Sequence, residues 1–256
     1  KPIVFKSHYP FLTFCRVILF FFGFSSFYIS LTVLPLGTAT ALFFVTPFLI
    51  TIFAHFFLKE EIGPRRWSAV AVGFVGVYVT LNPDFSNFNY LSLLPILCAF
   101  CYSLSMIIIK KTSDKDSVYT QTFTFYIGAI IFSLFFYFII GDGKFNTTDH
   151  PASQFIFREW FVDLENSYLF MVSTGFTATV AFLLLFTAYS IASPAVVSPF
   201  EYSILLWSPL IGWLYFKEIP TLSTIIGIII IVSSGIYIFL REKAQDQSIV
   251  TDKPLR

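Results

Sequence analysis

The sequence has little charge. Only 12% of its 256 residues are Asp, Glu, Lys or Arg, whereas 56% are hydrophobic. A soluble domain carries about 25% charged residues, so this chain has roughly half the charge that a water-exposed globular surface needs. The formal net charge of +1 also leaves no excess of basic residues for binding nucleic acid. These shortages exclude a soluble globular domain and a nucleic-acid-binding protein.

Residues for metal, redox and hydrolytic chemistry are also few. The chain has three cysteines, all inside apolar stretches, and three histidines that are far apart. Cys98 and Cys101 form a CxxC, but on a membrane helix this spacing favours packing of two small side chains over redox or metal chemistry. No HExxH, GxSxG or glycine-rich phosphate loop is present. The sequence therefore predicts no enzyme, no cofactor and no metal site.

What the chain has in abundance is long apolar stretches, rich in the 35 phenylalanines. They are about 17 to 25 residues long, the length that crosses a roughly 30 Å hydrocarbon layer as a helix. They lack strict alternation and are about twice as long as barrel strands, which excludes a β-barrel. The predicted fold class is all-α, a polytopic membrane helical bundle. Eight spans are expected, at residues 11–33, 36–58, 66–82, 90–109, 119–140, 167–191, 194–216 and 221–240.

The distribution of Lys and Arg predicts the orientation of these spans. With eight spans, both ends of the chain lie on the same side of the membrane. That side carries twelve Lys and Arg residues and the opposite side three, leaving out Arg16 inside the first span. Because short loops rich in Lys and Arg stay inside, both ends are expected to be cytoplasmic.

Two segments of the chain, residues 36–83 and 193–242, resemble each other. Each has a proline-containing helix, a Lys-Glu pair, a turn with a proline, and a glycine-containing helix that ends in "GVYV" or "GIYI". By the order of spans, the first copy enters from outside and the second from inside. Inverted repeats of this kind are typical of secondary transporters.

The number of spans predicts how the repeats are organised. The later copy has three spans before its repeated pair, whereas the earlier copy has one, and the chain begins at Lys1 without a methionine. We therefore expect two further helices upstream, on the order of 60 residues, and a complete five-plus-five arrangement of ten helices. The expected units are an incomplete first repeat (1–83, three helices), a second repeat (84–242, five helices, with an outer loop at 142–166) and a cytoplasmic tail (243–256).

The repeated segments also resemble a known family. The stretch "PLGTATALFFVTPFLITIFAHFFLKEEIGPRRWSAVAVGFVGVYVTLNP" is similar to the EamA module of the drug/metabolite transporter superfamily, and "SPAVVSPFEYSILLWSPLIGWLYFKEIPTLSTIIGIIIIVSSGIYIFLRE" to the last two helices of its second module. The early segment "HYPFLTFCRVILFFFGFSSFYISLTVLPL" is most similar to the subgroup that contains proposed S-adenosylmethionine uptake proteins. The resemblance implies a carrier of the bacterial inner membrane, with a central cavity between two inverted repeats.

Three ionisable residues lie inside the spans: Arg16, His55 and Glu201. Each costs about 2.5 to 3.5 kcal/mol to insert and is retained only for a reason. Glu201 and Arg16 are each roughly 10 Å from the cytoplasmic mouth at helical rise, so they could form an ion pair or share a water-filled cavity. Alternatively, Arg16 extends to lipid phosphates while Glu201 is protonated and hydrogen-bonded. His55 is interpreted as a solvated residue or a helix cap.

Prolines inside the spans predict where a substrate would bind, because interrupted helices in inverted-repeat carriers line the substrate site. Pro47 lies in the second span, and Pro199 and Pro209 in the seventh. The site is expected near mid-membrane, between the first, second, sixth and seventh spans. Besides Glu201 and Arg16, the candidate pathway residues are Thr46, Pro47, Tyr202 and Trp207, with Tyr28 and Tyr189 approaching the outer mouth.

Two further features predict packing and membrane contact. Gly73, Gly76 and Gly227 occur on helix faces where small residues let helices or protomers approach closely. The outer loop contains "QFIFREWFVDL", predicted as a short interfacial helix on the outer leaflet. Four apolar residues of this segment are expected on one helix face: Phe155, Ile156, Trp160 and Phe161.

Together, residues and resemblance predict a secondary transporter that moves a small polar or amphipathic metabolite across the cytoplasmic membrane by alternating access, with proton coupling or exchange. The alternatives are a drug or amino-acid exporter of the same family, and a membrane channel or structural subunit that does not transport. The expected partners are a small-molecule substrate and the lipid bilayer, with a homodimer as a further option.

Overall fold

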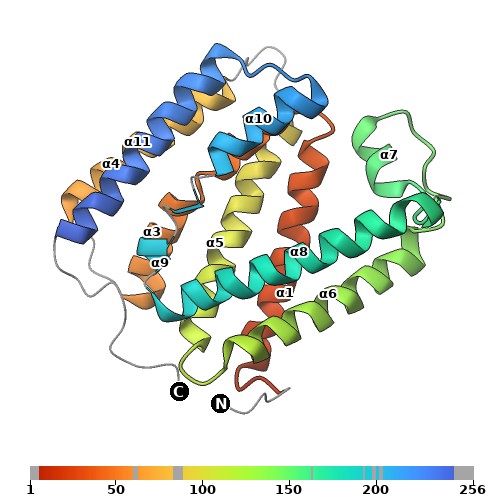
Figure 1. The fold of residues 1–256 in the computed structure, drawn as a ribbon, viewed down its shortest axis with the longest axis horizontal. Helices are drawn as coiled ribbons and strands as arrows, with labels where there is room; N and C mark the ends of the chain where they lie inside the picture. The colour runs from red at the N-terminus through yellow and green to blue at the C-terminus, as the bar shows by residue number, and fades with distance from the viewer. Residues whose placement is uncertain are drawn as a thin grey trace.

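The computed structural model describes residues 6–59, 63–82, 89–162, 164–192, 194–197, 200–201 and 204–244. In this part of the chain the regular structure is helical, without strands, and the helices pack as one bundle (Figure 1). The predicted all-α polytopic fold is confirmed. The elements are α1 (Pro10–Ser30), α2 (Leu36–Phe43), α3 (Thr46–Leu58), α4 (Pro64–Leu81), the 3-10 helix η1 (Tyr90–Leu93), α5 (Leu94–Thr112), α6 (Val118–Ile140), α7 (Pro151–Phe157), α8 (Leu164–Ile191), α9 (Pro194–Val197), α10 (Ile204–Phe216) and α11 (Leu222–Ala244).

Five of the predicted spans are helical segments long and apolar enough to cross a membrane. Within the described residues, α4 and α11 contain shorter apolar stretches, Trp67–Leu81 and Leu222–Tyr237, and the helices of the seventh predicted span, 194–216, are α9 and α10. The five long segments are Pro10–Ser30, Leu36–Leu58, Tyr90–Thr112, Val118–Ile140 and Ser167–Ile191.

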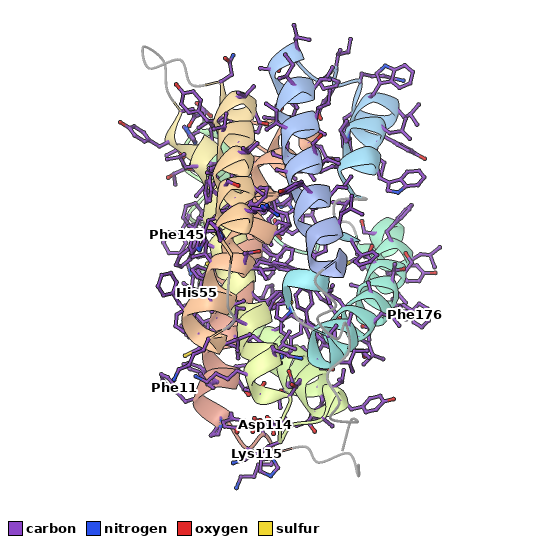
Figure 2. All side chains as sticks on the ribbon, turned by 90° about the vertical axis from the view of Figure 1, so that its left-hand side faces the viewer. Phe11, His55, Asp114, Lys115, Phe145 and Phe176 are labelled. Carbon is purple, nitrogen blue, oxygen red and sulfur yellow. The ribbon has the colours of Figure 1, made fainter. Side chains whose placement is uncertain are left out.

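Large apolar side chains cover the outside of the bundle. Phe11 on α1 and Phe176 on α8 project outward (Figure 2) and are 74% and 72% exposed. Asp114 and Lys115 instead lie at one end, in the turn between α5 and α6 (Figure 2). An apolar exterior with charged residues at its ends suits a lipid bilayer, whereas in water such a surface would aggregate.

Two predicted spans are interrupted. The span at 36–58 is divided into α2 and α3 by a turn at Phe44 and Val45, and the span at 194–216 is divided into α9 and α10. Pro47 is the second residue of α3 and accounts for the first interruption, because proline has no N–H to continue the preceding helical turn. Breaks of this kind at membrane depth occur where backbone is buried in protein or lines a cavity.

The helices of the two repeated segments keep a constant spacing. α3 begins at Thr46 and α10 at Ile204, 158 residues later, and the same spacing separates the last residues of these two helices and the first residues of α4 and α11. Lys59 and Lys217, which follow α3 and α10, both have positive φ, at 59° and 60°. α4 and α11 run side by side in opposite directions (Figure 1), so corresponding helices have opposite orientations.

Glycines make the closest helix contacts. A Cβ atom at Gly227 on α11 would lie 1.9 Å from Oγ1 of Thr80 and 2.8 Å from the carbonyl oxygen of Gly76, both on α4. A Cβ atom at Gly73 would overlap the ring of Phe48 on α3. The predicted role of these glycines in packing is confirmed.

Cys98 and Cys101 also serve packing. Both are buried, and a Cβ atom at Gly23 on α1 would lie 2.9 Å from Cβ of Cys101 on α5. Small side chains therefore let α1 and α5 approach closely, in agreement with the packing interpretation of the CxxC spacing.

The outer loop forms one short helix, α7, but it ends at Phe157, earlier than predicted. Arg158 has extended backbone angles and Phe161 has a φ of 63°, so the chain leaves the helix before Trp160. The expectation that all four apolar residues share one helix face is therefore wrong. They do line a single cavity: Phe155, Ile156, Trp160 and Phe161.

Candidate functional site

Glu201 accepts hydrogen bonds from two buried tyrosines. The hydroxyl of Tyr189, near the end of α8, donates to Oε1 of Glu201 at 2.6 Å, and the hydroxyl of Tyr102, in α5, donates to the same oxygen at 3.0 Å. Hydrogen bonds to a charged group stabilise by about 1.5–3 kcal/mol, which offsets part of the cost of a carboxylate away from water. These three side chains, the Glu201 group, join α5, α8 and the connection between α9 and α10.

Phe43 occupies the position in the first repeated segment that corresponds to Glu201 in the second. Phe43 precedes the first residue of α3 by three positions, as Glu201 precedes the first residue of α10. Both contact the same side chain, because the Phe43 ring meets the ring of Tyr102 edge-on at a centroid distance of 5.4 Å. The two helix interruptions therefore meet at Tyr102, with a carboxylate on one and an apolar ring on the other.

Thr46 and Pro47, both predicted as pathway residues, lie beside this group and are buried. The hydroxyl of Ser103, next to Tyr102 in α5, donates to the carbonyl oxygen of Thr46 at 3.3 Å. The hydroxyl of Thr46 itself donates to the carbonyl oxygen of Phe43. These contacts hold the start of α3 against α5.

The other candidates lie elsewhere. Tyr28 lines a cavity at the outer loop. Trp207 on α10 is 61% exposed and is not bonded to the Glu201 group. His55 lies near the end of α3, with its ring edge-on to Trp67 at 6.0 Å. Tyr202 lies outside the described residues.

The expectation that Tyr189 approaches the outer mouth is wrong. Ser167, at the start of α8, lines the cavity beside the outer loop. Tyr189 is 22 residues further along the same continuous helix, which places it about 33 Å away at 1.5 Å per residue. Tyr189 is fully buried at the opposite end of α8, where it bonds Glu201.

Arg16 is buried between α1, α6 and α8 and is only 1% exposed. Its Nη1 donates to the side-chain oxygen of Gln121 at 3.1 Å and its Nη2 to the Gln121 carbonyl oxygen, while its guanidinium lies over the rings of Phe125 and Phe186. Arg16 therefore neither extends to lipid phosphates nor forms an ion pair with Glu201. Gln121, its principal partner, was not among the candidates.

Buried aromatic rings fill the region between Arg16 and the Glu201 group. Phe20 is central, with its ring centroid 4.8 Å from Phe125, 6.0 Å from Phe186 and 5.9 Å from Tyr102. The first two rings contact Arg16, and the third contacts Glu201. In this conformation buried aromatic rings separate the two ionisable groups.

A second carboxylate, Glu218, connects the two repeated segments at the far ends of α2 and α10. Its Oε2 accepts from the backbone N–H of Leu36, the first residue of α2, at 2.7 Å. A Cβ atom at Gly37 would meet Pro209 of α10 at 3.4 Å, and the hydroxyls of Thr38 and Thr224 are 3.2 Å apart. Glu218 thus caps a helix of the other segment, where an anionic group is favourable.

Replacing Glu218 with Ala should loosen this contact. Loss of a hydrogen bond to a charged acceptor costs about 1.5–3 kcal/mol. The fraction of molecules in which α2 and the end of α10 are apart should therefore rise about tenfold or more. A reporter Leu36→Cys should then react faster with a membrane-impermeant maleimide. Glu218→Gln, which keeps an acceptor oxygen, should give an intermediate rate, and Lys217→Ala should leave the rate unchanged. Equal rates in all variants would show that Glu218 does not hold the contact.

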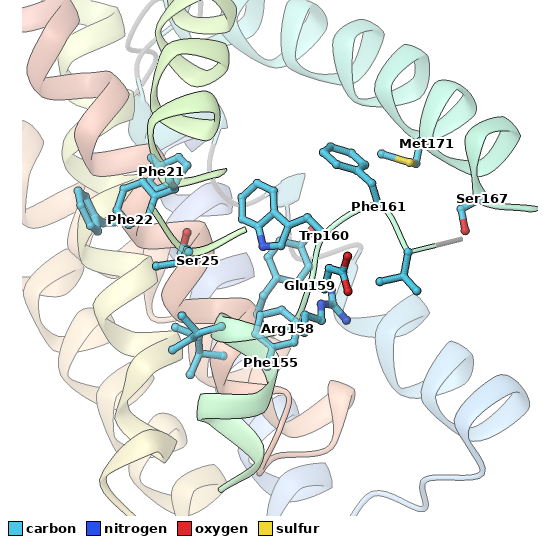
Figure 3. A pocket seen from close by; sticks show the side chains of 16 residues that line it. Phe21, Phe22, Ser25, Phe155, Arg158, Glu159, Trp160, Phe161, Ser167 and Met171 are labelled. Atoms are coloured by element: carbon cyan, nitrogen blue, oxygen red, sulfur yellow. The ribbon is translucent and has the colours of Figure 1, made fainter. Parts of the chain in front are cut away.

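A cavity of about 880 Å³ lies beside the outer loop, and we call it the outer-loop cavity (Figure 3). Its lining comes from α1, the C-terminal end of α6, residues 155–162 and the start of α8. Among the described residues, none from α2, α3, α9 or α10 lines it, so it differs from the central site expected between the first, second, sixth and seventh spans.

Comparison with known proteins identifies the family. The EamA-like transporter family model matches residues 2–82 and 90–240. An S-adenosylmethionine uptake transporter of Rickettsia felis is 32% identical over 240 residues, covering 93% of this chain and 74% of the relative. A riboflavin transporter of Rhizobium johnstonii is 27% identical over 242 residues, covering 94% and 74%.

The fold is likewise similar to a solved crystal structure, with a TM-score of 0.59 and 17% identity, over 95% of this chain and 80% of the other. Together with the apolar helices, the family match supports a multi-pass inner-membrane transporter rather than an enzyme, acting on a small-molecule substrate. The chain belongs to the EamA-like transporter family.

Proposed function

We propose that the protein is a secondary transporter that takes up a metabolite with a planar heteroaromatic ring and a cationic group, as in S-adenosylmethionine. The observation that carries this proposal is the Glu201 group, in which two tyrosines hydrogen-bond a carboxylate in the connection between α9 and α10. A carboxylate at membrane depth is a functional residue by default. An interrupted helix is also where transporters bind their substrates.

The substrate class follows from the relatives together with the site. S-adenosylmethionine and riboflavin, the compounds in the relatives' names, both contain a planar nitrogen heterocycle that carries a hydroxylated, sugar-derived group. The rings of Phe43 and Tyr102 beside Glu201 suit a planar heterocycle, since aromatic faces stack on it. The carboxylate favours a cation, which S-adenosylmethionine carries and riboflavin does not.

We further propose alternating access between two oppositely inserted repeats, residues 1–83 and 84–242, with both ends of the chain in the cytoplasm. The constant 158-residue spacing and the opposite directions of α4 and α11 support the repeats. The Glu218 contact between α2 and α10 would hold the outer side closed, and breaking it would open the path from outside. Glu201 would bind the substrate cation and a proton alternately, so that a substrate cation carried inward would be exchanged for a proton carried outward.

Counterflow in proteoliposomes tests this proposal. Vesicles loaded with unlabelled S-adenosylmethionine should accumulate the labelled compound transiently and saturably, and excess riboflavin should inhibit less than excess unlabelled substrate. Uptake without acceleration by internal substrate would indicate a channel. No uptake of either compound would indicate a structural subunit or a different substrate, and accumulation only in inverted vesicles would indicate an exporter.

A further inference from the structure

The outer-loop cavity has the composition of a ligand site. A volume of about 880 Å³ lies within the roughly 300–1,000 Å³ typical of small-molecule sites, which are mostly apolar with a few polar groups. The hydroxyls of Ser25 and Ser167 are among its polar groups. Its aromatic walls come from separate segments: Phe21, Tyr28, Phe136, Phe155, Trp160 and Phe161.

Contacts within the loop fix the wall formed by residues 155–162. The backbone N–H of Trp160 donates to the carbonyl oxygen of Gly141 at 3.0 Å, which ties the loop to the end of α6. The ring of Tyr137 on α6 packs against the rings of both Trp160 and Phe161, at 6.0 and 5.6 Å. The indole of Trp160 is therefore held facing the cavity (Figure 3), so a ligand would enter a preformed site.

The two charged residues of the lining differ in how they are engaged. The guanidinium of Arg158 lies over the ring of Phe155, 4.8 Å from its centroid. The exposed carboxylate of Glu159 forms no ion pair with any residue in the described part of the chain. Arg158 keeps its positive charge but is held over the ring of Phe155, whereas the carboxylate of Glu159 and the faces of Trp160 and Phe161 offer the groups that favour a cation.

We propose that the outer-loop cavity binds planar aromatic organic cations, with the ring system against Trp160 and Phe161 and the positive charge toward Glu159. The site is distinct from the Glu201 group, which lies at the other end of α8. It needs no transport activity to bind. Since the proposed substrate belongs to this chemical class, the cavity would concentrate it at the outer face before transport.

The test uses N-methylacridinium, a fluorescent planar cation, and acridine at pH 8, its neutral parent of nearly the same shape. Binding to the protein in lipid nanodiscs is titrated in a Glu201→Gln background, so that only sites other than the Glu201 group remain. N-methylacridinium should bind saturably and acridine about tenfold more weakly, because a desolvated cation over aromatic faces gains roughly 1–2 kcal/mol.

Four variants locate the site. Trp160→Ala and Glu159→Gln should each weaken binding of the cation about tenfold, and only Trp160→Ala should also weaken binding of acridine. Trp160→Phe, which keeps an aromatic wall, should restore most of the affinity. Trp213→Ala, at another exposed tryptophan, should have no effect.

Unchanged binding in Trp160→Ala and Glu159→Gln would overturn the proposal. The proposal would also fail if Trp160→Ala reduced the amount of co-purified lipid, measured by mass spectrometry, without changing cation binding. The cavity would then hold acyl chains. This binding result can be distinguished from the result for transport. If counterflow is lost in Glu201→Gln but normal in Trp160→Ala, the proposed function stands, whatever the cavity binds.

Discussion

Uptake of S-adenosylmethionine is expected to fall about 100-fold when Glu201 is replaced with Gln. The substitution keeps the size of the side chain and an acceptor for Tyr102 and Tyr189, but it removes the charge that would bind the substrate cation or a proton. Removing one partner of a buried charge pair costs about 2–5 kcal/mol, and 1.4 kcal/mol corresponds to a factor of ten. The measurement is the initial rate of counterflow in proteoliposomes with equal amounts of protein.

Variants of the two tyrosines distinguish the effect of the Glu201 charge on uptake from the effect of the hydrogen bonds that position it. Tyr102→Phe and Tyr189→Phe each remove one hydrogen bond to Oε1 and should reduce uptake about tenfold. Asp142→Asn, which removes the charge of an exposed carboxylate outside both proposed sites, should leave uptake unchanged. If Glu201→Gln transported normally with the same pH dependence, Glu201 would serve only the packing of α9 and α10.

Glu201 stands out in the sequence because a carboxylate inside an apolar span is rare and costly. Tyr102 was missed for the opposite reason. Tyrosine is common in membrane helices, and nothing in the stretch around Cys101 and Ser103 distinguishes its hydroxyl from other polar atoms. Only the packing of α5 against the two helix interruptions brings Tyr102 to Glu201 and Phe43.

Arg16 illustrates a limit of reasoning from depth. Counting residues from the start of each helix predicts similar depths for Arg16 and Glu201, but depth says nothing of the direction in which a side chain points around its helix. Arg16 faces Gln121 on α6, and the aromatic layer around Phe20 lies between it and Glu201. A span of uniformly apolar residues carries little periodic signal from which that direction could be inferred.

The helices themselves were predictable because long apolar stretches have one stable solution in a bilayer. The interruptions were predictable in place but not in form. Pro47 indicates the break between α2 and α3. Apolar residues continue on both sides of it, so a hydropathy criterion identifies a single span at 36–58. The 158-residue spacing that relates the repeats can likewise be traced in the sequence through the Lys-Glu pairs that contain Lys59 and Lys217.

Replacing Gly227 with Leu is expected to destabilise the protein by about 3 kcal/mol, the upper part of the usual range for overpacking. A Cβ atom there would lie 1.9 Å from Oγ1 of Thr80, 2.9 Å from its backbone nitrogen and 2.8 Å from the carbonyl oxygen of Gly76. The Thr80 hydroxyl also donates to that carbonyl oxygen at 3.0 Å. Because two of the obstructing atoms are backbone, a change of rotamer cannot relieve the overlap, and α4 and α11 must move apart.

Gly175 on α8 provides the matched control, since a Cβ atom there would meet nothing within 4 Å. Gly175→Leu should leave stability unchanged or raise it slightly, because glycine is roughly 0.8–1.0 kcal/mol less favourable in a helix than alanine, and leucine ranks close to alanine. The measurement is the midpoint of SDS-induced unfolding in mixed micelles, compared for both variants and the unmodified chain. If Gly227→Leu unfolded at the same point as Gly175→Leu, close packing of α4 against α11 would contribute little to stability, and the two repeats would be held together mainly through the packing of α5 against α1 and α3.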